Sequence, residues 1–126
     1  MKIRRGFVSN SSSSSFVIAV KEGELTEEKL LRAFGVKKDA LLYPIVSQMA
    51  KWFVKYSKFS TPEKILKEYT YGDIVDLPDY LGKALKIGKI YLGSAYSDGD
   101  EIEQAMCMME INFENDELWM YKEAGY

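Results

Sequence analysis

The sequence predicts an α+β fold: one helix-rich domain with a small sheet of about three strands, in the order β-α-α-α-α-β-α-β. The chain has 126 residues, the length of one ordinary domain, and 47% of them are apolar, which is enough to fill a core. Helical periodicity with capping signals recurs through the middle of the chain, whereas strand-like apolar runs stand near its ends. We therefore expect a flexible serine-rich segment at 1–15 and a single globular domain at 16–126.

The first expected element is a strand over Phe16–Val20, which is apolar at every position, as in strands buried on both faces. The preceding residues include a run of serines that bury too little apolar surface to order themselves. This serine-rich segment is therefore expected to be irregular and tethered to the core.

Two helices are expected next. Thr26 is a capping hydroxyl before two acids and predicts a helix over residues 27–34, which Gly35 ends. Apolar residues at helical spacing over Ile45–Tyr56 predict a second helix that ends at residues 56–58.

Two further helices are marked by their ends. Thr61-Pro62-Glu63 combines a capping hydroxyl, a proline at the first helical position and an acid in the first turn, which predicts a third helix. A fourth helix is expected from about Pro78 to Lys86, with Gly88 ending it in the left-handed conformation.

The last third of the chain reads as strand, helix and strand. We expect a strand over Lys89–Ala95, a helix over Glu101–Met109 and a half-exposed strand over Glu117–Lys122. This order predicts a right-handed parallel crossover.

An alternative stays open for Ala105–Phe113. Ile111 and Phe113 alternate with polar residues, so this stretch is also compatible with a strand. It would then form a hairpin with the last strand through Glu114–Asp116.

Composition excludes several kinds of chemistry. The chain has no histidine and one cysteine, Cys107, which excludes Ser-His-Asp and Cys-His catalysis and any structural zinc site built from cysteine and histidine ligands. A single cysteine forms no internal disulfide, which fits a reducing cytoplasm. The longest apolar runs have five residues, against about 18 for a membrane span, so we expect no transmembrane segment, no signal peptide and a cytoplasmic protein.

One acidic turn is a candidate metal site. Asp98, Asp100 and Glu101 place carboxylates at a turn and helix start, where magnesium or calcium could bind. A divalent-metal-dependent enzyme using this turn is one functional hypothesis. The alternative is that these acids only stabilise the N-terminus of a helix.

Charge is distributed unevenly along the chain. The first 89 residues hold 16 Lys and Arg against 10 Asp and Glu, and the last 37 hold 1 against 9. The acidic C-terminal region would repel nucleic acid and could compete for basic surfaces. Alternatively, the two parts neutralise each other within the fold.

A second functional hypothesis concerns Lys51–Lys58. Trp52, Phe53, Tyr56 and Phe59 are interleaved with three lysines here, a pattern typical of proteins that bind single-stranded nucleic acid. An amphipathic helix that buries its aromatic face has the same pattern.

The N-terminus carries a more specific pattern, in which Gly6-Phe-Val-Ser-Asn10 precedes a serine run and Phe16. It resembles the start of a set of small uncharacterised proteins from bacteria, archaea and especially their phages. Gly93-Ser94, Ser97-Asp98 and the closing residues 121–126 also resemble features of that set. The resemblance implies a phage or mobile-element context and carries no activity.

The apolar residues beside the serines make this segment a candidate partner contact, with Phe7, Val8, Ser9, Asn10 and Phe16 as its residues. Because no catalytic constellation is recognisable, the hypothesis we favour is a small non-enzymatic accessory protein. It would act by binding a host or phage macromolecule, and we expect an unidentified protein partner.

Overall fold

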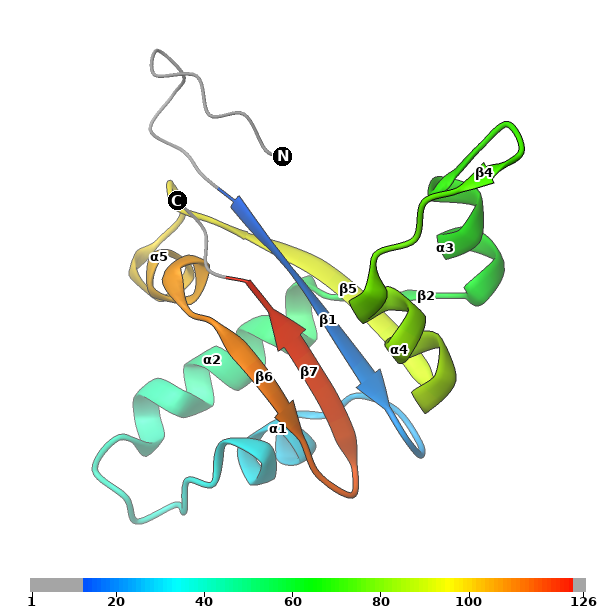
Figure 1. Cartoon of the computed structure of the whole chain (residues 1–126). Coiled ribbons are helices and arrows are strands. Elements are labelled where there is room, and N and C mark those ends of the chain that lie inside the picture. The colour runs from blue at the N-terminus through cyan, green and yellow to red at the C-terminus, as the bar shows by residue number, and fades with distance from the viewer. Residues whose placement is uncertain (1–12, 124–126) are drawn as a thin grey trace.

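The computed structural model describes residues 13–123. Within them the chain forms five α-helices, a five-stranded antiparallel sheet and a separate two-stranded hairpin (Figure 1). In chain order the elements are β1 (Ser13–Val20), α1 (Glu27–Phe34), α2 (Tyr43–Tyr56), β2 (Lys58–Ser60), α3 (Pro62–Glu68), β3 (Thr70–Tyr71), β4 (Ile74–Val75), α4 (Asp79–Ile87), β5 (Lys89–Tyr96), α5 (Glu101–Met108), β6 (Ile111–Glu114) and β7 (Leu118–Lys122).

The predicted fold, with about three strands in the order β-α-α-α-α-β-α-β, is therefore wrong. It misses β2, the β3–β4 hairpin and β6. β2, β3 and β4 have only two or three residues each, too few to show an alternating pattern. β6 does alternate, and only the alternative for 105–113 used that pattern.

β1 is the central strand of the sheet, whose order is β2-β5-β1-β7-β6. It pairs antiparallel with β5 from Ser13 opposite Tyr96 to Val20 opposite Lys89, and with β7 on its other side. Residues 16–20 are at most 2% exposed. The predicted burial of this strand on both faces is thus confirmed.

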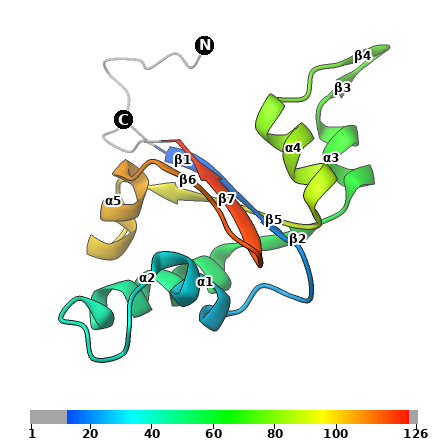
Figure 2. The ribbon, with the colours of Figure 1, turned by 60° about the horizontal axis from the view of Figure 1, so that its bottom comes forward.

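Helices cover both faces of the sheet, with α1, α2 and α5 on one side and α3 and α4 on the other (Figure 2). Successive residues of a strand point to opposite faces. Phe16 and Ile18 therefore pack in the core under α2, while Val17 and Ala19 pack in the core under α4. No helix in residues 13–123 is long and apolar enough to span a membrane.

The helix starts follow the sequence closely. The side chain of Thr26 accepts a hydrogen bond from the Lys29 amide at 3.2 Å, and Thr61 caps α3 in the same way at 3.3 Å. Gly88, however, is not left-handed, since its φ is 170°. A Cβ at residue 88 would collide with the carbonyl of Val20, so glycine is needed here because the end of β1 passes close to the backbone of Gly88.

The expected parallel crossover is also wrong, because β5 and β7 are separated by β1 and each pairs with it antiparallel. The segment 105–113 is helix up to Met108, where α5 ends, and strand from Ile111, where β6 begins. The alternative of a strand over the whole segment is therefore wrong for its first half. β6 then pairs with β7 as a hairpin, as the alternative for this segment proposed.

β7 was expected to be half-exposed, and this is wrong. Leu118, Trp119 and Met120 are at most 2% exposed. The strand lies between β1 and β6, and its two faces contribute to the two separate cores.

β1 begins at Ser13, three residues before the expected start at Phe16. The backbone of these serines pairs with β5, and Ser14 is buried with its hydroxyl donating to the Cys107 carbonyl at 3.0 Å. The backbone hydrogen bonds to β5 and the Ser14 hydrogen bond stabilise this part of the strand, although serine side chains bury little apolar surface. The rest of the serine-rich segment lies outside the described residues.

Candidate functional site

The predicted acidic turn lies at the start of α5, where Asp100 and the neighbouring Glu103 bind backbone amides. Asp100 Oδ1 accepts from the Glu103 amide at 2.9 Å, and Glu103 Oε2 accepts from the Tyr96 amide at 2.9 Å. Asp98 and Glu101 are exposed. Within residues 13–123, no group of three or more acids or cysteines is arranged to hold a metal ion.

Of the predicted partner-binding residues, Phe7, Val8, Ser9 and Asn10 lie outside the described residues. Phe16 is 2% exposed, and its ring stands edge-on to Phe53 with 4.9 Å between ring centroids. Its side chain therefore belongs to the core and is not open to a partner.

The Lys51–Lys58 segment divides between core and surface. Trp52 and Phe53 are buried, as expected for an amphipathic helix. Lys51, Lys55 and Lys58 are exposed, together with about half of the surface of Tyr56 (49%) and Phe59 (54%).

The uneven charge along the sequence is partly neutralised in the fold. Lys21 and Lys83 both pair with Glu114, at 2.9 and 3.5 Å, and Arg32 pairs with Glu117 at 2.7 Å. Hydrogen bonds from Lys21 and Arg32 hold the pKa of Glu114 and Glu117 below the usual value. All three ion pairs join the basic part of the chain to the acidic C-terminal region.

Lys122 is a buried titratable group. Its ammonium donates to the carbonyls of Cys107 at 3.1 Å, Met109 at 2.7 Å and Glu123 at 3.0 Å. Burial lowers the pKa of Lys122 to about 8. These hydrogen bonds connect β7, which carries Lys122, to the end of α5. The Lys122 side chain is 0% exposed and does not contact solvent.

Among the described strands, β3 and β4 carry the most exposed apolar side chains. We call the hairpin that they form, residues 70–76, the hairpin arm. Every residue of it is exposed, and Tyr71, Ile74 and Val75 are 62%, 67% and 57% exposed. Figure 1 shows the arm projecting beyond α3 and away from the sheet. A two-stranded hairpin is marginally stable by itself in water, so an apolar one in this position is a candidate binding element.

The base of the arm is fixed although its tip is open. Tyr69 and Leu77, which flank it, pack against the core under α4. The Asp76 amide donates to the Tyr69 carbonyl at 2.8 Å, and the Thr70 hydroxyl donates to the Leu66 carbonyl at 2.5 Å. The arm is therefore held in a defined position relative to α3 and α4.

The arm is also acidic. From Glu68 to Asp79, with both ends included, the chain has four acids and no basic residue. An apolar tip with acids around it is complementary to an apolar cleft with a basic rim.

The arm was not predicted from the sequence, although a local signal for it exists. Tyr71 and Ile74 are paired across the two residues Gly72-Asp73, and Gly72 has a φ of 63°. Gly-Asp between two β-prone residues is a recognised two-residue hairpin signal, with glycine in the position that needs positive φ.

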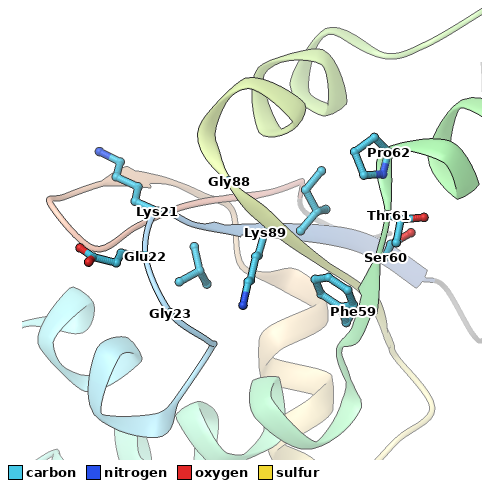
Figure 3. A pocket seen from close by; sticks show the side chains of 11 residues that line it. Lys21, Glu22, Gly23, Phe59, Ser60, Thr61, Pro62, Gly88 and Lys89 are labelled. Carbon is cyan, nitrogen blue, oxygen red and sulfur yellow. The ribbon is translucent and has the colours of Figure 1, made fainter.

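A separate hollow of about 310 Å³ lies at one end of the sheet, next to β2 (Figure 3). It is lined by Val20, Lys21, Glu22, Gly23, Phe59, Ser60, Thr61, Pro62, Gly88, Lys89 and Ile90. Figure 3 shows Phe59 and Lys89 pointing to the same side, while the Glu22 carboxylate points away from both.

Comparison with protein-family models, with curated proteins and with solved structures finds no match to this chain.

Proposed function

We propose that this protein is a small non-enzymatic accessory protein that binds a protein partner through the hairpin arm. The complementary surface on the partner is an apolar cleft with a basic rim. The resemblance of residues 6–16 to proteins of phages supports a phage or mobile-element origin, and the partner is then a host or phage protein.

The exposure of Tyr71, Ile74 and Val75 on a projecting hairpin carries this proposal. Fully burying an aliphatic side chain such as Ile74 contributes about 1.5–3 kcal/mol. Part of this free energy offsets the entropy lost on association. That loss is small when the hairpin arm is already held in place by the residues that flank it.

The acids around the arm add selectivity. Asp73 lies in the turn and Asp76 at the end of the arm, and both are exposed. Charges at the rim of an interface mainly raise the association rate and reject partners of like charge. A basic partner surface is therefore favoured over an acidic one.

The test is a pull-down from the native host or infected cells, read by mass spectrometry. The chain is compared with the double variant Tyr71→Ser, Ile74→Ser. Both positions are solvent-exposed, so the double variant should keep the melting temperature of the core. Leu41→Ser is the matched control, because Leu41 is 93% exposed and lies outside the arm.

The proposal predicts one stoichiometric partner with the unchanged chain and with Leu41→Ser, and its loss with the double variant. Capture of the same partner by the double variant contradicts the proposal, as does the absence of any partner with all three proteins.

A further inference from the structure

A second exposed aromatic surface lies at the β2 edge of the sheet, on the face covered by α2. Phe59 of β2 is 54% exposed, and its ring lies against Tyr91 of β5 with 5.6 Å between ring centroids. The Tyr91 hydroxyl accepts a hydrogen bond from the Leu25 amide at 3.3 Å. Phe59 is therefore a well-supported ring with about half of its surface open to solvent.

Tyr56, the last residue of α2, provides a second exposed ring. It is 49% exposed, and its ring packs on Trp52 at 5.2 Å between centroids. The ammonium of Lys55 lies 5.2 Å from the centre of the Tyr56 ring. The end of α2 and the start of β2 thus present two supported aromatic rings and a cation.

The chain segment that holds these rings carries only positive charge, although Glu68 of α3 lines a hollow together with Lys58 and Phe59. Residues 40–62 contain Lys51, Lys55 and Lys58 and no acid. All three lysines are exposed, and none forms an ion pair with another residue of the described range 13–123. Their charges remain available to an anionic partner.

The hollow beside β2 extends this basic surface. Lys89 and Phe59 point to the same side of it, and the hydroxyl of Ser60 lies in its lining (Figure 3). The strand order places β2 at the opposite edge of the sheet from β6 and Glu114. Lys21, which also lines the hollow, is paired with Glu114, so Lys89 is the lysine of the hollow that adds to this surface. The overall net charge of −2 therefore does not describe this surface.

The geometry points to single-stranded nucleic acid as the ligand of this surface, which we call the β2 face: Lys51, Lys55, Tyr56, Phe59 and Lys89. Phe59 and Tyr56 would stack on unpaired bases, and the lysines would contact phosphates. Stacking needs bases whose faces are open, which a duplex does not offer. This activity is separate from that of the hairpin arm.

Fluorescence anisotropy with a labelled oligothymidylate of about 16 nucleotides tests the inference. Three phosphate contacts, one for each lysine of the β2 face, predict that log K falls against log salt with a slope of about −2. Phe59→Leu keeps an apolar contact with Tyr91 but removes the aromatic face, and should weaken binding about 5- to 150-fold. Lys55→Gln should reduce the slope by about 0.7.

Lys67→Gln is the matched control, since Lys67 is an exposed lysine of α3 outside the β2 face. It should leave affinity and slope unchanged. Absence of binding at low salt overturns the inference, and so does equal binding of a duplex or of a polyglutamate peptide of similar charge.

The two surfaces are separable by experiment. The double variant Tyr71→Ser, Ile74→Ser should bind the oligonucleotide normally, and Phe59→Leu should still capture the protein partner. Loss of oligonucleotide binding in the double variant contradicts a binding site on the β2 face alone.

Discussion

Phe16 and Gly93 face each other across the β1–β5 ladder, and the Phe16 ring fills the space that a Cβ on residue 93 would need. We expect Gly93→Ala to destabilise the fold by about 1–3 kcal/mol, because the ring is already packed on Phe53. Gly82→Ala in α4 is the control, since, apart from the adjoining backbone of α4, no atom of the described residues lies within 4 Å of the added Cβ. It should stabilise by about 0.5–1 kcal/mol. Urea unfolding measures both, and equal effects would contradict this role for Gly93.

Because Lys122 is buried, we expect the free energy of unfolding to rise with pH in the alkaline range. Its pKa is about 8 in the fold against 10.5 when unperturbed, so between these values the unfolded chain binds more protons. The free energy of unfolding therefore increases with pH there, by about 3 kcal/mol in total. Below about pH 8 Lys122 is charged in both states, so the full cost of burying the ammonium lowers the free energy of unfolding. Above about pH 10 the tyrosines also ionise and add their own pH dependence.

Lys122→Met isolates this contribution because it cannot titrate. Urea unfolding across pH should show the difference between wild type and variant shifting in favour of wild type from about pH 8 to 10. A difference that stays constant across this window would contradict a lowered pKa for Lys122.

Arg32 and Glu117, 85 residues apart, form two parallel hydrogen bonds of 2.7 Å each. Because this contact lowers the pKa of Glu117, its stabilisation is present at neutral pH and is lost as pH falls through the lowered value. We expect Glu117→Gln to have a lower melting temperature than wild type at neutral pH and low salt, with the gap closing in acid or high salt. Asp116→Asn, at an exposed neighbouring carboxylate, should show no such gap.

Asp100 and Asp98 distinguish a helix cap from a metal site. Of these two residues, Asp100 accepts a backbone hydrogen bond, from the Glu103 amide at 2.9 Å, and Asp98 accepts none from the described residues. Asp100→Ala should therefore destabilise by about 0.5–2 kcal/mol and Asp98→Ala by much less. Millimolar magnesium or calcium should leave the melting temperature unchanged. A metal-dependent rise in melting temperature that both substitutions remove would establish a metal site here.

The helices and strands that were predicted correctly are indicated by residues within or directly beside the element itself. Thr26 and Thr61 mark helix starts within a few residues, and the all-apolar run at Phe16–Val20 marks a doubly covered strand. β2 has no such mark, because its three residues form a strand only by pairing with β5, about 30 residues later. Short strands of this kind are decided by tertiary pairing, which a single sequence does not display.

The binding surfaces were predicted less well for a related reason. Phe16 looked like a partner contact because serines precede it, yet two helix layers bury its strand. The sequence analysis gave no role to Ile74, which is 67% exposed because no helix of the described residues covers the hairpin arm. Residue type indicates what a side chain can bind, while exposure depends on what packs over it.

Photo-crosslinking from the hairpin arm tests the central claim most directly. A photoreactive phenylalanine analogue replaces Ile74 in one protein and Leu41 in another, and both are irradiated in the native host or in infected cells. The account predicts a crosslink from position 74, and not from position 41, to one protein at an apolar site with basic residues around it. No crosslink from position 74, or the same products from both positions, would contradict binding through the hairpin arm.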